Sequence, residues 1–141
     1  MQAQGQRPES VVAGGTRDLR NRLDCSRAAF ETIHLKMVAL QEELDWQVYS
    51  LFGLCDANVL TDEVLEQGLH PEQRPVEQML KKRIAEGEAS IFYDVHKYRG
   101  TGKRMPRLPP ATDEVIQQRL RVIENTPSVR LVEQPDFKRR W

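Results

Sequence analysis

A chain of 141 residues has room for one domain and rarely for two. Apolar residues make up 39% of it, and they occur in periodic blocks, which excludes a chain that is disordered throughout. No apolar run approaches the roughly 18 residues of a membrane span, and no signal peptide precedes the domain. Cys25 and Cys55 lie far apart and lack the spacing of a redox or metal motif. We therefore expect a cytoplasmic protein with reduced thiols and no membrane partner.

The net charge is zero, but the two halves of the chain differ. Residues 1–70 carry 6 Lys/Arg and 11 Asp/Glu, a net charge of −5, whereas residues 71–141 carry 15 and 10, a net charge of +5. Such asymmetry favours an anionic partner for the second half, such as a nucleic acid. The alternative is that the two halves attract each other.

The first half of the chain is dominated by one long predicted helix. Residues 1–15 are rich in Gln and Gly without any period, so we expect a disordered lead, followed by a single helical domain over 16–141. Thr16 is a candidate N-cap, Asp18 suits the first turn, and Gly53 suits the end of a helix over about 17–52. Two rows recur every seven residues: Leu23, Phe30, Met37, Leu44 and Leu51, and Leu19, Ser26, Ile33, Leu40 and Gln47. A helix with this stripe must bury it in an antiparallel partner or in another chain.

Shorter helices are predicted after the long one. Thr61 is expected to cap a helix over 62–67 that ends at Gly68, and Pro75 to open a helix over 75–86 that ends at Gly87. Thr112 is expected to cap a helix over about 113–125. The apolar faces of the last two consist of Val76, Met79, Leu80 and Ile84, and of Val115, Ile116, Leu120 and Ile123. A short helix is favoured for "ASIFYDVHKY" (89–98), a loop for "RGTGKRMPRLPP" (99–110), and a short extended stretch with an irregular basic tail for the C-terminus. The predicted fold class is all-α.

Glu42, Glu43 and Asp45 form the most concentrated group of acids in the long helix. Glu42 and Asp45 are three residues apart and share a face, so they could bind a metal or act as acid and base. However, no His lies at the spacing of a di-metal motif, and no second helix repeats the pattern. His34, His70 and His96 are isolated from other ligands as well. We therefore expect a solvated helix face, with no catalytic, cofactor-binding or metal residues in this chain.

A basic cluster is the clearest candidate for binding. Five cations lie within eleven residues that contain no acid, and they are the candidate contacts to a DNA backbone: Lys97, Arg99, Lys103, Arg104 and Arg107. The tail Lys138, Arg139 and Arg140 is a weaker candidate. A solvated loop has the same composition, so that alternative stays open.

Three blocks of the sequence resemble one family. They are "MVALQEELDWQVYSLFGL" (37–54), "RPVEQMLKKRIAEGEASIFYDVH" (74–96) and "QQRLRVIENTPSVRLVEQPDFKRRW" (117–141). The most specific parts are "LQEELDW" followed by Tyr and "GL", and the closing "KRRW". In this order the blocks resemble the C-terminal region of PglX-type DNA adenine methyltransferases of bacteriophage exclusion (BREX) and restriction-modification systems. The "YRGTGKRM" loop departs from the family pattern.

The resemblance implies that this chain is part of an enzyme but lacks the enzyme's cofactor-binding and catalytic motifs. Full-length members carry an S-adenosylmethionine motif and an (Asn/Asp)-Pro-Pro-(Tyr/Phe) motif, and Pro109-Pro110 does not match the second because Leu108 precedes it. The expectation is a non-catalytic fragment, truncated at both ends, that is inactive alone and contacts DNA and the missing methyltransferase domain or another subunit. The alternative is a free-standing interaction module that self-associates through the long helix.

Overall fold

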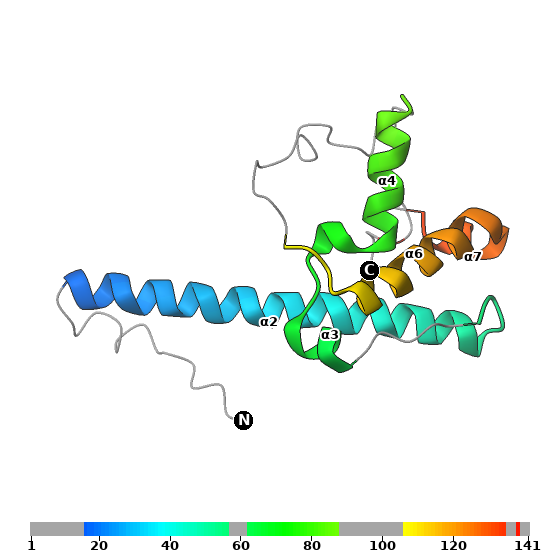
Figure 1. Ribbon diagram of the computed structural model, residues 1–141. Helices are drawn as coiled ribbons and strands as arrows, with labels where there is room; N and C mark the ends of the chain where they lie inside the picture. Colours follow the sequence, from blue (N-terminus) through cyan, green and yellow to red (C-terminus); the bar gives the residue numbers. More distant parts are fainter. Residues whose placement is uncertain (1–15, 57–61, 88–105, 135–137, 139–141) are drawn as a thin grey trace.

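The computed structural model describes residues 16–56, 62–87, 106–134 and Lys138, and these residues form helices and no strand (Figure 1). The predicted all-α class is confirmed. The elements are α2 (Thr16–Leu51), α3 (Asp62–Gln67), the short 3-10 helix η1 (Pro71–Gln73), α4 (Pro75–Ala85), α6 (Pro110–Asn125) and α7 (Pro127–Val132). The predicted lead over 1–15 and the predicted helix over 89–98 lie outside the described residues.

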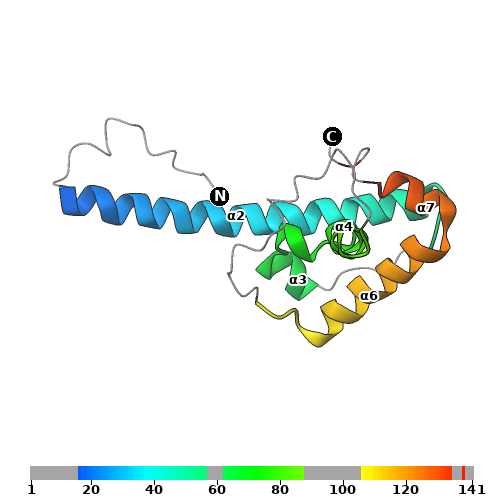
Figure 2. The same cartoon turned by 90° about the horizontal axis from the view of Figure 1, so that it is seen from above.

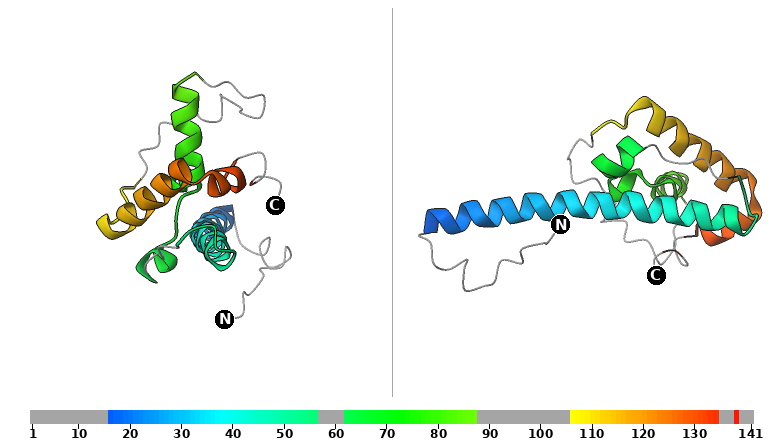
Figure 3. Two further views of the ribbon diagram at one scale, coloured as in Figure 1. Left: turned by 90° about the vertical axis from the view of Figure 1, so that its right-hand side faces the viewer. Right: turned by 90° about the horizontal axis from the view of Figure 1, so that it is seen from below.

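Helix α2 runs the length of the molecule, and the shorter helices gather over its C-terminal half (Figures 1 and 2). The same arrangement is seen from the end and from below in Figure 3. The backbone N–H of Leu69 donates to the carbonyl of Leu35 at 2.9 Å, and Ala39 is the first fully buried residue of α2. We call residues 16–34 the stalk, and we call the head the remainder of α2 together with α3, η1, α4, α6 and α7.

Three glycines with positive φ follow the first three α-helices, as the sequence predicts. Gly53, Gly68 and Gly87 have φ values of 68°, 90° and 88°. Gly68 also lies directly against α2, because a Cβ atom at this position would stand 2.6 Å from the carbonyl carbon of Leu35. The absence of a side chain at Gly68 therefore allows the chain after α3 to touch the long helix.

Two apolar clusters hold the head together. One contains Trp46, Tyr49, Ile123 and Val129, and the other contains Val64 and Ile116. The apolar faces predicted for α4 and α6 are confirmed, since Val76 and Leu80 of α4 and Ile116 and Ile123 of α6 are buried. With α4 and α6 in contact as well, the head is a single packed unit.

Two predictions about helix ends are wrong. Helix α6 begins at Pro110 with Pro109 as its N-cap, so Thr112 lies buried in the first turn instead of capping the helix. The stretch from Ser128 onward, predicted to be extended, begins instead within α7 (Pro127–Val132): Thr126 is extended, and Pro127 has the φ value that a first helical turn needs. Burial of Val129 in the core then outweighs the strand preference of the β-branched Val129 and Val132.

The two heptad rows predicted to pack are largely exposed within this chain. Leu23, Phe30, Met37, Leu44 and Leu51 of the first row are all more than half exposed, and so are Ile33 and Leu40 of the second. The short helices cover the opposite face of α2, which carries the acids. The described helices contain none that is long and apolar enough to cross a membrane.

Candidate functional site: a buried charge network

Glu42 is the centre of a network of charges between α2 and the shorter helices. Its side chain is fully buried, and its Oε1 accepts a hydrogen bond from the indole Nε1 of Trp46 at 2.7 Å. Its Oε2 accepts one from the Nε of Arg74 at 2.7 Å. The prediction of a solvated helix face is wrong here, because a carboxylate can be buried when cations and donors replace its water.

Glu43 pairs with a buried arginine from α6. The Nη2 of Arg119 donates to Glu43 Oε2 at 2.9 Å, and its Nη1 lies 3.7 Å from Glu42 Oε1. The guanidinium of Arg119 also stands 5.0 Å from the centre of the Trp46 ring, within reach of a cation–π interaction. Arg119 therefore joins two acids and an aromatic ring of α2 to α6.

Asp45 extends the network toward the C-terminus. It accepts a hydrogen bond from Arg74 Nη2 at 2.9 Å and lies 3.3 Å from the ammonium of Lys138. Lys138 also pairs with Glu133, which accepts a hydrogen bond from the hydroxyl of Tyr49 at 2.7 Å. The side chain of Lys138 is only 9% exposed. Its prediction as part of a phosphate-binding tail is therefore wrong, whereas Arg139 and Arg140 lie outside the described residues.

The pKa values of the network follow from burial and neighbouring charges. Burial would raise the pKa of Glu42, but Lys138, Arg74 and Arg119 together outweigh it and lower the pKa below 4.5. For Glu133 burial prevails, and with the charge of Glu42 it raises the pKa despite Lys138. Burial and then the charge of Glu133 raise the pKa of Tyr49 well above its usual value. Two carboxyl groups of one network are thus shifted in opposite directions.

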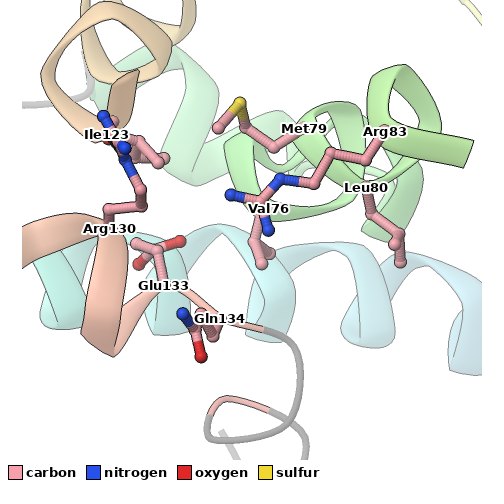
Figure 4. A pocket seen from close by; sticks show the side chains of 8 residues that line it. All are labelled: Val76, Met79, Leu80, Arg83, Ile123, Arg130, Glu133 and Gln134. Atoms are coloured by element: carbon pink, nitrogen blue, oxygen red, sulfur yellow. Dashed lines mark hydrogen bonds between the residues drawn. The ribbon is translucent and has the colours of Figure 1, made fainter. Parts of the chain in front are cut away.

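The network borders two cavities of very different size. The larger, of about 800 Å³, is lined by Asp45, Tyr49, Arg74 and Lys138 of the network together with Gln41, Val48, Leu131 and Val132. The smaller, between α4 and α7, measures only about 10 Å³, and Figure 4 shows the side chains of Met79 and Arg83 on one side of it and those of Arg130 and Glu133 on the other. Such a space holds at most one water molecule. Glu133 Oε2, which has no hydrogen-bond partner among the described residues, is the group that such a water would satisfy.

The acids and histidines of the described residues lie in different settings. Among the described residues, no three His, Cys, Asp or Glu side chains are grouped to hold a metal ion. His34 stacks on Phe30 with ring centres 6.0 Å apart, on the exposed stalk. The carboxylates of α2 are bound by cations of the head, so their arrangement is that of a structural network.

The predicted DNA contacts fall largely outside the described residues. Lys97, Arg99, Lys103 and Arg104 belong to that part of the chain. Arg107 is described: it is exposed and lies three residues before α6.

The residues that sequence reasoning missed are the cations of the network. Arg74, Arg119 and Lys138 all belong to the second half of the chain, and the acids of α2 belong to the first. The opposite net charges of the halves were the signal that could have found them. The alternative interpretation, attraction between the halves, is confirmed for these residues.

Comparison with known proteins now places the chain in a family. Its residues 37–141 match the family described as "Domain of unknown function (DUF7008)". The chain belongs to this family. The match begins at Met37, two residues before the first fully buried residue of α2, so it covers most of the head and leaves out the stalk.

A curated relative extends the similarity to the stalk. The chain is 35% identical over 135 residues to the adenine-specific methyltransferase PglX of Streptomyces coelicolor. The match covers 92% of this chain and 11% of that protein, so this chain spans a small part of its relative's length. The predicted resemblance to a region of PglX is confirmed. No solved structure matches the chain.

Proposed function

We propose that this chain is a non-catalytic helical module of a PglX-type DNA adenine N6-methyltransferase, acting in the bacterial cytoplasm in phage defence or restriction-modification. The observation that carries the proposal is the 35% identity to PglX over 92% of the chain. In this role the module is a scaffold for the methyltransferase, which supplies the S-adenosylmethionine site and the catalytic residues. It also contacts the DNA backbone.

The charge network supports the scaffold role. Arg74 and Arg119 tie the segment before α4 and the helix α6 to one turn of α2, which carries Glu42, Glu43 and Asp45. Pairs of this kind hold only when both partners are in position, because an unpaired buried charge is costly. The head therefore presents a fixed arrangement of helices on which another domain can dock.

A deletion tests the scaffold role. Removing the segment of the Streptomyces coelicolor PglX that matches this chain is expected to abolish adenine methylation of cellular DNA, and inserting this chain in its place is expected to restore it. The matched control is the same insertion with Arg119→Ala, which is expected to restore less because the head is destabilised. Methylation that persists after the deletion contradicts the scaffold role.

The DNA-contact role rests on the basic segment from Lys97 to Arg107. If about four of its cations contact phosphates, the slope of log affinity against log salt is near −3.6, at about −0.9 per contact on duplex DNA. We expect weak binding without sequence preference, measured by fluorescence anisotropy in dilute buffer. Reversing the charges of Arg99, Lys103, Arg104 and Arg107 together is expected to abolish it.

The control for this experiment reverses exposed cations elsewhere. Arg20 and Lys36 lie on the exposed part of α2 and outside the basic segment, so their reversal is expected to leave the salt slope unchanged. Equal losses in both variants, with both folds intact by circular dichroism, mean that the basic segment is an ordinary solvated loop.

A second candidate function is a free-standing interaction module that associates through α2. The observation that favours it is the exposed apolar face of this helix. It differs from the first candidate in needing no methyltransferase, so the deletion and insertion experiment separates the two.

A further inference from the structure

The face of α2 opposite the charge network is apolar and exposed. Its large apolar side chains are between 54% and 83% exposed along the whole helix: Leu23, Phe30, Ile33, Met37, Leu40, Leu44 and Leu51. We call this set the outer stripe. It runs through both the stalk and the head, whereas the burial of α2 begins only near Ala39. The described helices of the head all pack on other faces of α2, so the stripe serves no contact in the core.

The spacing of the outer stripe is that of a coiled coil. From Phe30 to Leu44 its residues alternate steps of three and four, and the two rows of seven-residue repeats continue from Leu19 to Leu51 with Ser26 and Gln47 as the polar exceptions. A helix on a globular surface needs only a broad apolar face with a period of 3.6. A sustained period of 3.5 keeps one narrow line of contact, which is what a second long helix requires.

We propose that the outer stripe is the interface of an antiparallel homodimer in which α2 packs along α2 of a second copy of this chain. The length of α2 indicates that a second copy of this chain, and not one of the described helices, covers the outer stripe. Helix α2 has 36 residues and is about 54 Å long at about 1.5 Å per residue, whereas the next longest described helix has 16. Two copies of α2 match each other end to end.

The size of the contact is that of a stable dimer. Stable interfaces involve about 20 to 30 residues on each side. The two rows and the positions that flank them supply 20 positions, of which Glu43 is already buried in the network, so the contact lies at the lower end of this range. The rest of the network is untouched by this contact, because it lies on the other face of α2.

The register follows from the two rows. When residues whose numbers add to 70 face each other, each member of the first row meets a member of the second. Phe30 then meets Leu40 of the second copy, and Met37 meets Ile33. The polar exceptions Ser26 and Gln47 meet Leu44 and Leu23, outside the central pairs. The large apolar side chains thus concentrate in the middle of the interface.

Charge decides the orientation. In a parallel pair, Arg22 would flank Arg27 of the second copy, and the two segments 16–36, each with five basic and three acidic residues, would lie together. In the antiparallel pair each stalk lies beside the head-proximal half of the other helix, where Arg27 flanks Gln41. Two flanking residues meet their own copy at the centre, Lys36 in one flanking row and His34 in the other. The antiparallel arrangement therefore carries less like-charge repulsion.

The molar mass in solution tests the association. The full chain is expected to have about twice its 16.3 kDa by light scattering, and Phe30→Glu is expected to weaken the dimer by on the order of a hundredfold or more. The matched control is Ala28→Glu, an exposed residue of the stalk outside both rows, which is expected to leave the mass unchanged. A monomeric wild-type chain overturns the proposal, and so does an equal loss in both variants.

Cysteine pairing tests the orientation without relying on a charge in the interface. Two single variants, Ile33→Cys and Met37→Cys, are made with Cys25 and Cys55 replaced by Ser, and one carries a small tag. A disulfide in the mixture but in neither variant alone is expected, because only the antiparallel register brings residue 33 to residue 37 of the other copy. Disulfides in each variant alone mean a parallel dimer and overturn the proposal.

The proposal goes beyond the methyltransferase role and does not depend on it. A monomeric chain whose insertion restores methylation would overturn the dimer alone, and the outer stripe would then belong to the methyltransferase domain. A dimeric chain whose deletion leaves methylation intact would overturn the scaffold alone.

Discussion

The two faces of α2 are buried in the reverse of the order that their hydropathy predicts. The face toward the head carries Glu42, Glu43 and Asp45 and is buried, whereas the face toward solvent carries the outer stripe. The buried face is stable because α4, α6 and the C-terminal segment bring cations to the acids. The comparison shows that the partner of a helix, and not its own hydropathy, decides which face is covered.

The network differs from apolar packing in how it responds to damage. A buried ion pair adds little stability over a well-packed apolar pair of the same size, because both ions lose water. Loss of one partner, however, leaves the other charge buried without compensation. The head should therefore be most sensitive at the residues where one cation serves two acids.

The largest expected effect is at Arg119, which contacts both Glu42 and Glu43. Arg119→Ala is expected to lower the free energy of unfolding by about 3–5 kcal/mol, the usual cost of breaking a buried pair. Urea denaturation followed by circular dichroism measures it. The control is Lys82→Ala, which removes an exposed pair with Glu124 and is expected to leave the unfolding midpoint nearly unchanged. Similar midpoints for the two variants would show that the network does not hold the head.

A smaller loss of stability is expected at Gly68, where the chain after α3 packs against the backbone of α2. Gly68→Ala places a Cβ atom 2.6 Å from the backbone of Leu35, so α3 has to move away from α2. Gly87→Ala is the matched control, because its φ is nearly the same and no atom lies within 4 Å of the added Cβ. The difference between the two variants isolates the steric term, which we expect to be about 1–3 kcal/mol in thermal or urea unfolding. Equal losses would mean that this contact is loose.

The opposite pKa shifts of Glu42 and Glu133 give a test by pH. The pKa of Glu42 is lowered in the fold, so its stabilising contribution is present above its ordinary value of 4.5 and is lost as the pH falls through the lower folded value. The pKa of Glu133 is raised, so its ionisation costs stability as the pH rises from 4.5 through the folded value.

Two variants separate these contributions in urea unfolding at several pH values. Glu42→Gln is expected to flatten the acid decline of stability below 4.5, and Glu133→Gln to flatten the decline above it. Glu66→Gln, an exposed residue of α3, is the control that should reproduce the wild-type profile. Profiles that coincide for all three variants would show that the network does not titrate with folding.

Local signals predicted the helices of this fold well, and long-range pairing was not predicted. Gly53, Gly68 and Gly87 mark helix ends because only backbone geometry is involved. The burial of Glu42 could not be read from its neighbours, since its partners Arg74 and Arg119 are 32 and 77 positions away and are brought near only by folding. The heptad rows were identified correctly as a stripe, but nothing in them says whether this chain or another one covers it.

The function, like the fold, was predicted in part from the sequence and in part not. The similarity to PglX extends over nearly the whole chain and therefore indicates common ancestry. It does not distinguish residues that bind a partner from residues that hold the fold. The five candidate DNA contacts were chosen from local charge alone. Lys138 was chosen on the same ground, and in the structure it pairs with Asp45 and Glu133. A cation is a candidate for binding DNA only if it is not already paired with an acid of its own chain. Of the five candidates, Arg107 is the one that lies in the described part of the chain, and it is exposed.

The smallest expected effect compares the two faces of α2 directly, at residues only two positions apart. Tyr49→Phe removes the buried hydroxyl that donates to Glu133 and is expected to cost about 1–3 kcal/mol of unfolding free energy. Leu51→Gln changes a side chain that is 83% exposed, and in dilute solution, where the chain is monomeric, it is expected to cost less than about 0.5 kcal/mol. At higher concentration the same variant should begin to lose stability relative to the wild type, because Leu51 then packs against the second copy. A cost for Leu51→Gln equal to that of Tyr49→Phe at every concentration would mean that the outer stripe is covered within one chain, and the contrast between the two faces would disappear.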